Sequence, residues 1–148
     1  MTTIRYNLSK HSWFDELDFP EYLEPDFDQI WNLHPKKPSY VRVFGKNHLS
    51  PRFEQSYGVN YTFSGTTHEK LPVPEHLQAI FDWANQTEYG PFNGMLVNLY
   101  ENGHSYIAKH RDNESYLVAD SPVLSISLGT NRPLRIRDYQ TNKIIQDV

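Results

Sequence analysis

The chain has 148 residues and a formal net charge of −4, with 38% hydrophobic and 22% charged residues. These values are typical of one globular domain and exclude a disordered or fibrous chain. The sequence has no cysteine, which excludes disulfides and thiolate metal sites, and no apolar run approaches the roughly 20 residues of a membrane span. We therefore expect a single domain over residues 1–148, intracellular and without a membrane partner.

Charge is unevenly distributed along the first third of the chain. Seven acidic residues and no basic one fall between residues 15 and 28, whereas residues 29–53 contain basic residues and no acidic one. The basic residues of this stretch are Lys36, Lys37, Arg42, Lys46 and Arg52. A local basic patch attracts a polyanion even when the net charge is negative. An ordinary solvated face explains the same pattern, so charge alone leaves both interpretations open.

Two segments have the periodicity of amphipathic helices. The first follows Pro25 and places Phe27, Ile30 and Trp31 on one face. The second begins at Pro74, and its apolar residues at i, i+3, i+4 and i+7 are Leu77, Ile80, Phe81 and Ala84. We expect the second helix to pack on a sheet.

Most of the remaining sequence contains short apolar or alternating runs that end at turn residues, which predicts β-strands. We expect strands at residues 40–44, 59–63, 95–100, 124–128, 134–137 and 143–148. This spacing predicts a mostly β (α+β) fold with flanking helices, arranged as a double-stranded β-helix or jelly roll. A jelly roll needs about eight strands. Because six or seven are visible here, we expect its C-terminal strands to be missing.

The motif His110-Arg111-Asp112 is the strongest candidate for chemistry. Side chains two residues apart in a strand point to the same face, so the imidazole and the carboxylate would converge. They would supply two of the three ligands of the two-histidine-one-carboxylate site found in non-haem iron(II) oxygenases. Taken alone, a His-Asp pair is more often a surface hydrogen bond than a metal site.

Asn98 and Tyr100 also lie two residues apart, on the strand expected at residues 95–100. On an inward face, these polar side chains would need a polar partner, because an unpaired buried polar group costs stability. A bound small carboxylate would satisfy both. The alternative interpretation is an edge strand whose polar face meets water.

The turn at residues 101–103 would return the chain as a hairpin. The strand carrying His110 would then lie beside the strand carrying Asn98, and both pairs would share a face. Glu114 follows Asp112 by two residues and would point the same way.

Several short motifs occur in a fixed order between residues 41 and 137. They are Val43-Phe44-Gly45-Lys46, Pro51-Arg52, Tyr57-Gly58, Tyr61-Thr62-Phe63-Ser64-Gly65, Leu96-Val97-Asn98-Leu99-Tyr100, His110-Arg111-Asp112-Asn113-Glu114 and Ser121-Pro122-Val123-Leu124-Ser125-Ile126-Ser127-Leu128-Gly129. Together they resemble the AlkB family of iron(II)/2-oxoglutarate dioxygenases, in particular the branch that repairs alkylated DNA in animal nuclei. An ordered series of this kind is far more specific than His-x-Asp alone.

The resemblance implies a cofactor site. His110 and Asp112 would bind Fe(II), and Asn98 and Tyr100 would contact 2-oxoglutarate. The implied activity is oxidative demethylation of N-alkylated bases in DNA or RNA, in the nucleus if the host is eukaryotic.

The resemblance also implies substrate contacts. Tyr61 and Phe63 would line the pocket for a base flipped out of the stack, with Glu114 near its edge. Phe44 would be the wedge that fills the gap in the stack, and Arg52 would lie beside the DNA there. A base inside a duplex cannot reach a buried metal, so extrusion and a wedge fit the chemistry. The alternative interpretation of the three aromatic residues is an ordinary strand core.

The sequence departs from the family after His110, because no later histidine is present. The family has a second histidine ligand further downstream and an arginine that pairs with the far carboxylate of 2-oxoglutarate. Three explanations are open: a truncated product, a second chain that completes the sheet, or a remnant that binds nucleic acid without catalysis. A related oxygenase acting on a protein or small molecule is less compatible with the Phe44 motif and the basic stretch.

Overall fold

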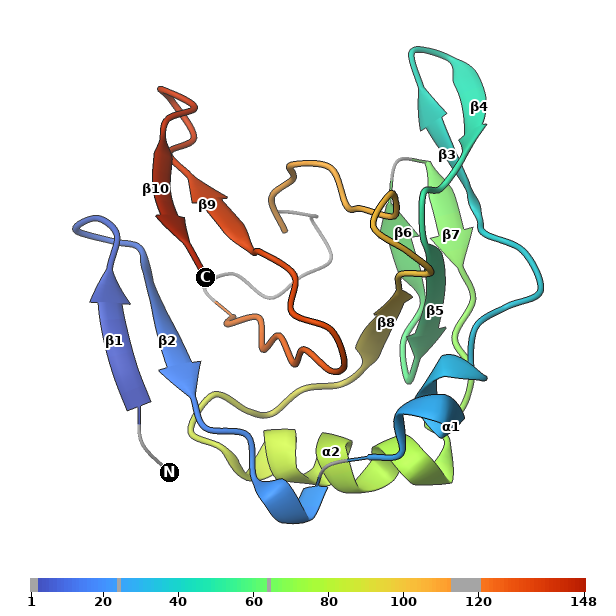
Figure 1. Cartoon of the computed structure of the whole chain (residues 1–148), viewed down its shortest axis with the longest axis horizontal. Coiled ribbons are helices and arrows are strands. Elements are labelled where there is room, and N and C mark those ends of the chain that lie inside the picture. Colours follow the sequence, from blue (N-terminus) through green and yellow to red (C-terminus); the bar gives the residue numbers. More distant parts are fainter. Residues whose placement is uncertain (1–2, 24, 64, 113–120) are drawn as a thin grey trace. The chain divides into compact units, whose positions relative to one another are not determined.

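The computed structural model describes residues 3–23, 25–63, 65–112 and 121–148. The chain divides into two compact units, Met1–Glu24 with Ser125–Val148 and Pro25–Leu124, and each is described by itself. Figure 1 shows the order of the elements along the chain. Within the described ranges, no helix has the length and apolar character needed to cross a membrane. The single domain over residues 1–148 stays a prediction.

The first unit contains two antiparallel hairpins and a short 3-10 helix. The elements are β1 (Thr3–Asn7), β2 (Trp13–Leu17), η1 (Glu21–Leu23), β9 (Arg135–Arg137) and β10 (Ile144–Asp147). Directly opposite residues hold the first hairpin: the guanidinium of Arg5 binds Asp15 at 2.6 Å, and the rings of Tyr6 and Phe14 stack at 4.4 Å. Cross-strand pairs of this kind stabilise an antiparallel pair.

The second unit carries every described candidate for the functional site. Its elements are α1 (Phe27–Trp31), β3 (Tyr40–Val43), β4 (Lys46–Leu49), β5 (Phe53–Tyr57), β6 (Tyr61–Phe63), β7 (Thr66–His68), α2 (Glu75–Gln86) and β8 (Met95–Leu99). The strands pair as β3–β4, β5–β8 and β6–β7, all antiparallel. The mostly β composition is confirmed, whereas the described strands form two-stranded pairs and the jelly roll stays a prediction.

The two predicted helices are confirmed. The side chain of Asp26 caps α1 by accepting hydrogen bonds from the backbone N–H groups of Asp28 and Gln29, and Ile30 is buried. In α2, which begins after Pro74, the buried residues are Leu77, Ile80 and Ala84, at the spacing that the sequence predicts. Each short helix therefore buries one apolar face.

The pairing of β5 with β8 forms the centre of the second unit. Tyr57 and Leu99 are buried at opposite ends of this pair, and the ring of Phe53 meets the edge of Trp31 of α1 at 6.2 Å. Where β5 ends, Gly58 has a φ of +80°, and a Cβ there would lie 2.8 Å from the carbonyl oxygen of Asn93. Only glycine allows this turn and this close backbone approach.

Two strand expectations are corrected. Residues 124–128 alternate between half-buried and exposed, as predicted, but they form no strand, and the described part of the chain gives them no hydrogen-bonded neighbour. Residues 104–112 are irregular, and the strand paired with β8 is β5, not a returning hairpin. Alternation reports which side chains are covered, whereas a strand also requires a partner for its backbone.

Candidate active site

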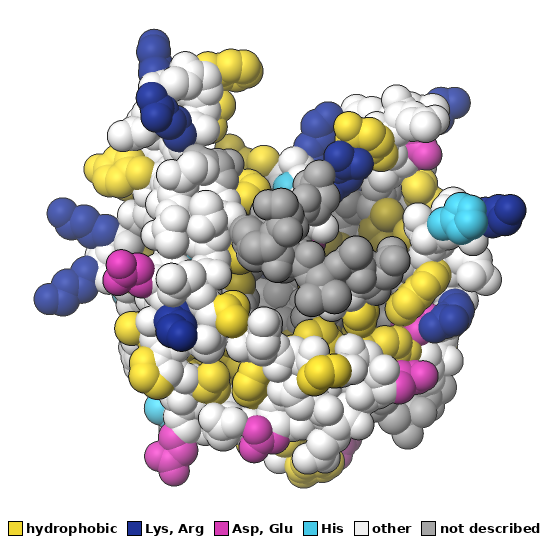
Figure 2. All heavy atoms as spheres, turned by 180° about the vertical axis from the view of Figure 1, so that it is seen from behind, with side chains coloured by type: hydrophobic (Ala, Val, Ile, Leu, Met, Phe, Trp, Pro, Cys, Tyr) yellow, Lys and Arg dark blue, Asp and Glu magenta, His cyan; other side chains and the backbone are white. Residues whose placement is uncertain are grey.

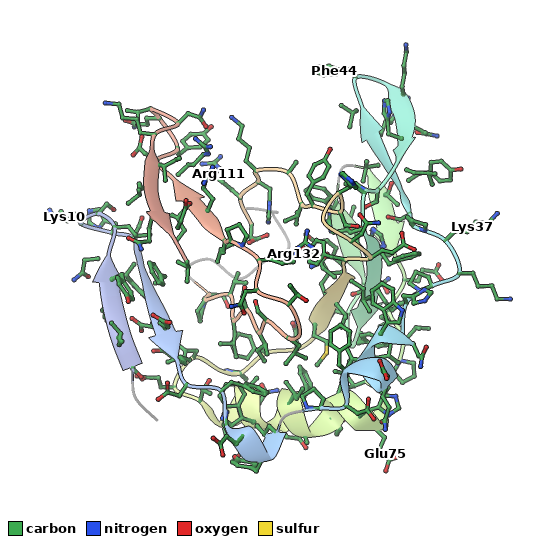
Figure 3. The ribbon with its side chains drawn as sticks, viewed as in Figure 1. Lys10, Lys37, Phe44, Glu75, Arg111 and Arg132 are labelled. Atoms are coloured by element: carbon green, nitrogen blue, oxygen red, sulfur yellow. The ribbon has the colours of Figure 1, made fainter. Side chains whose placement is uncertain are left out.

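An exposed aromatic ring stands at the tip of the β3–β4 hairpin. The two-residue turn consists of Phe44 and Gly45, with φ values of 49° and 78°, and the Phe44 side chain is fully exposed at 101%. Two positive φ values are characteristic of the type I′ turn that fits the twist of a hairpin. For a non-glycine residue, this left-handed conformation costs roughly 1–2 kcal/mol of conformational free energy. Figure 3 shows Phe44 at the outer end of the hairpin.

Basic side chains flank the exposed ring. Arg42 and Lys46 are exposed on either side of the turn, and Val43 is also exposed. Figure 2, seen from behind, shows basic and hydrophobic side chains together at the outer end of this hairpin (upper left). A ring between two cations suits contact with stacked bases and their phosphates.

The base of this hairpin is fixed to β7. The hydroxyl of Thr66 in β7 donates to the carbonyl oxygen of Tyr40 in β3 at 2.6 Å. Within the hairpin, the N–H of Ser50 donates to the carbonyl oxygen of Ser39 at 2.8 Å and closes its base. Because β7 pairs with β6, the exposed tip and the β6 aromatic residues belong to connected hairpins.

β6 carries two neighbouring aromatic rings, and one of them, Phe63, contacts the candidate metal ligand His110. Tyr61 and Phe63 are half-buried, and their rings are nearly parallel, with centroids 6.5 Å apart and an interplanar angle of 15°. The ring of Phe63 meets the imidazole of His110 edge-on, at 6.4 Å and 75°. An aromatic surface of this kind is suited to stacking a planar base.

His110 and Asp112 converge although they lie in an irregular segment. The Nε2 atom of His110 is 3.8 Å from the Oδ1 atom of Asp112, and the Nδ1 atom of His110 is 2.9 Å from the carbonyl oxygen of Ala108. A carbonyl only accepts, so Nδ1 is the donor of this hydrogen bond, and Nε2 is the ring nitrogen that faces Asp112. Metal-binding histidines are typically oriented by such a hydrogen bond from the other ring nitrogen.

The donor set of this pair fits Fe(II). An imidazole nitrogen and a carboxylate oxygen are the donor types of two-histidine-one-carboxylate iron sites, so His110 and Asp112 would supply two of the ligands. Among residues that the structure describes, no group of three His, Asp or Glu residues is placed to hold a metal. Glu114 lies outside the described residues.

Asn98 of β8 lies within a polar cluster that involves β5. The Nε of Arg52 donates to the Oδ1 of Asn98 at 2.8 Å, and a terminal nitrogen of the same guanidinium pairs with Glu54. Glu54 and Asn98 are directly opposite each other in the β5–β8 pair. Tyr100 follows β8 directly and is half-buried. Asn98 and Tyr100 as contacts of 2-oxoglutarate stay predictions.

Arg52 lies in a buried cluster of polar side chains, and its expected position beside DNA stays a prediction. Its side chain is 5% exposed, and that of Glu54 is 1% exposed. The hydroxyl of Ser39 also donates to Glu54 at 2.7 Å, and the Nε2 of His68 lies 4.0 Å from it. Glu54, Ser39 and His68 were not predicted from the sequence as part of a site. The available signal was the spacing Arg52-x-Glu54, which would put two opposite charges on one strand face.

The sequence matches a known family model. Residues 10–148 match the 2OG-Fe(II) oxygenase superfamily. The chain belongs to this superfamily. Membership implies Fe(II) and 2-oxoglutarate as cofactors, in agreement with the donor set of His110 and Asp112 and with the resemblance to the AlkB family.

Three curated members of this oxygenase superfamily are similar to the chain, all with the name DNA oxidative demethylase ALKBH2. The protein of Bos taurus is 38% identical over 120 residues, covering 74% of this chain and 43% of the relative. The Homo sapiens protein is 39% identical over 120 residues, which cover 74% of this chain and 46% of that relative. The Mus musculus protein is 39% identical over 100 residues, which cover 66% of this chain and 42% of that relative. The chain thus spans less than half the length of these relatives.

Proposed function

We propose that this chain acts as an Fe(II)/2-oxoglutarate-dependent oxidative demethylase of N-alkylated bases in DNA. The observation that carries the proposal is the edge-on contact of Phe63 with His110, because an aromatic surface would then lie beside the proposed metal ligands. The name shared by the three relatives supports DNA as the nucleic acid.

The residues of this chain would hold the cofactors and orient them. His110 Nε2 and Asp112 would bind Fe(II), while the Ala108 carbonyl accepts the hydrogen bond of Nδ1 and orients the imidazole ring. The amide of Asn98 and the hydroxyl of Tyr100 would donate to 2-oxoglutarate. When bound, Fe(II) and 2-oxoglutarate supply, with dioxygen, the oxidation of an alkyl carbon on a base nitrogen, after which the carbon leaves as an aldehyde.

Base flipping would bring the damaged base to this site. Tyr61 and Phe63 would stack against the extruded base and exclude water, and Glu114 would contact its edge. Phe44 would enter the vacated position in the stack, where its ring replaces part of the lost stacking energy. The exposed Phe44 in a strained turn supports this role, since folding alone gives no reason for that residue there.

A second candidate is a nucleic-acid-binding module without catalysis. It is favoured by the β3–β4 hairpin, whose exposed Phe44, Arg42 and Lys46 need no metal to contact nucleic acid. A second chain that contributes a further metal ligand would add catalysis to such a module, and RNA would be an alternative substrate.

Repair of a defined lesion tests the proposal. The 148-residue chain is incubated with Fe(II), 2-oxoglutarate and DNA or RNA oligonucleotides carrying 1-methyladenine, and loss of the methyl group is followed by mass. Loss from DNA that vanishes in Asp112→Ala supports the demethylase. Binding to the oligonucleotide without methyl loss would refute catalysis by this chain alone and support the binding module. Methyl loss from RNA only would overturn DNA as the substrate.

A further inference from the structure

We infer that Arg52 is a positioning residue for the cofactor site, acting through Asn98. The inference rests on the proposed function, because it assumes that Asn98 contacts 2-oxoglutarate. It gives Arg52 a role inside the protein in place of a contact with DNA.

Hydrogen bonding determines how the Asn98 amide must be turned. A guanidinium has only donors, so the atom of Asn98 facing Arg52 must be the carbonyl oxygen. The observed contact is Arg52 Nε to Asn98 Oδ1, at 2.8 Å. The opposite rotamer would place two N–H groups against each other. The amide nitrogen is therefore directed away from Arg52 and is available to donate to an oxygen of 2-oxoglutarate, which has only acceptors.

Glu54 in turn fixes Arg52. The two side chains form an ion pair in which both are almost fully buried, and planar guanidinium groups are well suited to such pairing. Glu54 also accepts a hydrogen bond from Ser39 at 2.7 Å. Glu54 thus compensates the buried charge of Arg52 through the terminal nitrogen, while the neighbouring Nε of the same guanidinium donates to Asn98.

This arrangement is incompatible with simultaneous use of Arg52 on a phosphate. Phosphate contacts require a side chain that reaches solvent, whereas only 5% of this one is exposed. The exposed cations of the β3–β4 hairpin, Arg42 and Lys46, are the ones placed for that purpose.

The first measurement reads the Asn98 amide directly. Its side-chain NH₂ resonances are assigned by their loss in Asn98→Asp and compared between the wild type and the double variant Arg52→Met/Glu54→Gln, which removes both buried charges together. We expect well-dispersed resonances in the wild type, because the Oδ1 of the same amide is held by Arg52, and random-coil values in the double variant. Arg52→Lys, which keeps a donor, should restore part of the dispersion. Unchanged resonances in the double variant would overturn the inference.

The second measurement separates the cofactor role from a role on DNA. Mn(II) replaces iron, the Kd of 2-oxoglutarate is measured by calorimetry, and DNA binding is measured by fluorescence anisotropy. We expect the double variant to weaken 2-oxoglutarate binding by about 10- to 100-fold, as loss of an outer-shell partner does at metal sites. DNA affinity should change less than twofold. A loss of DNA affinity with unchanged 2-oxoglutarate binding would refute the inference.

A third comparison distinguishes positioning from a general structural effect. In an Asn98→Ala background, the double variant should cause no further loss of 2-oxoglutarate affinity, because residues acting through one contact are not additive. A full additional loss would show that Arg52 does not act through Asn98. If the wild type itself binds no 2-oxoglutarate, the proposed function of this chain is refuted. The Asn98 resonances then still show whether Arg52 orients the Asn98 amide.

Discussion

His110 and Asp112 lie 3.8 Å apart, Nε2 to Oδ1, in a segment that is not a strand. Their convergence therefore depends on the path of the irregular backbone and on the hydrogen bond of His110 to the Ala108 carbonyl. Removal of either proposed ligand should reduce Mn(II) affinity by more than the roughly 10- to 100-fold typical of outer contacts. Titration of His110→Ala and Asp112→Ala by electron paramagnetic resonance measures this loss. His76→Ala, on the exposed face of α2, is the matched control and should bind as the wild type does.

Phe44 should contribute to nucleic-acid processing at a cost in stability. Phe44→Gly removes the positive-φ penalty without losing any burial, so the free energy of unfolding should rise by about 1 kcal/mol. Methyl loss from duplex DNA should fall at least tenfold, because no ring replaces the extruded base. Denaturant unfolding and the repair assay measure the two effects. Tyr22→Ala, which removes another exposed ring, should leave repair unchanged. Equal repair by Phe44→Gly would exclude the wedge role.

Arg42 and Lys46 should contribute sequence-independent affinity for DNA. Each substitution to Gln should weaken binding to all oligonucleotides alike and reduce the slope of log K against log salt by about 1. Anisotropy titrations at several salt concentrations measure the slope. Lys70→Gln, outside this hairpin, is the matched control. An unchanged slope in both hairpin variants would mean that this hairpin does not contact phosphate.

The buried pair of Arg52 and Glu54 should be sensitive to removal of one partner. Arg52→Met leaves an uncompensated buried carboxylate and should lower the free energy of unfolding by about 3–5 kcal/mol. The double variant Arg52→Met/Glu54→Gln should recover more than half of that loss, because neither charge is then buried. Urea unfolding of the three proteins measures both values, and equal destabilisation by the single and double variants would contradict the coupling.

The β9–β10 hairpin should lose stability in acid. Hydrogen bonds from Arg135 lower the pKa of the exposed Asp147 carboxyl below its ordinary value. A carboxyl whose folded-state pKa is lowered contributes stability above its unfolded pKa of about 3.9, and this contribution is lost as the pH falls through the folded value. Hydrogen exchange of the hairpin amides should therefore differ between the wild type and Asp147→Asn near neutral pH. The difference should vanish below the folded-state pKa, and one that persists there would contradict the ion pair as its cause.

Local patterns in the sequence determined much of the fold. Apolar spacing predicted α1 and α2, and the alternation at residues 40–44 predicted β3 and a turn beside it. These features depend on neighbours in the chain, so they can be read without the fold. The ordered motifs around His110 and Asp112 were sufficient to indicate the oxygenase family that the comparison confirms.

Only the tertiary structure decided which residues meet across long separations. Residues 124–128 have the alternation of a strand but no described partner, whereas β5, with its polar Glu54, Gln55 and Ser56, is a strand because β8 supplies its hydrogen bonds. The hydrogen bond of Arg52 to Asn98 was likewise invisible in the sequence, since the two residues are 46 positions apart in the chain. Pairing of backbones and of buried charges is a property of neighbours in space, and a single sequence records only neighbours in the chain.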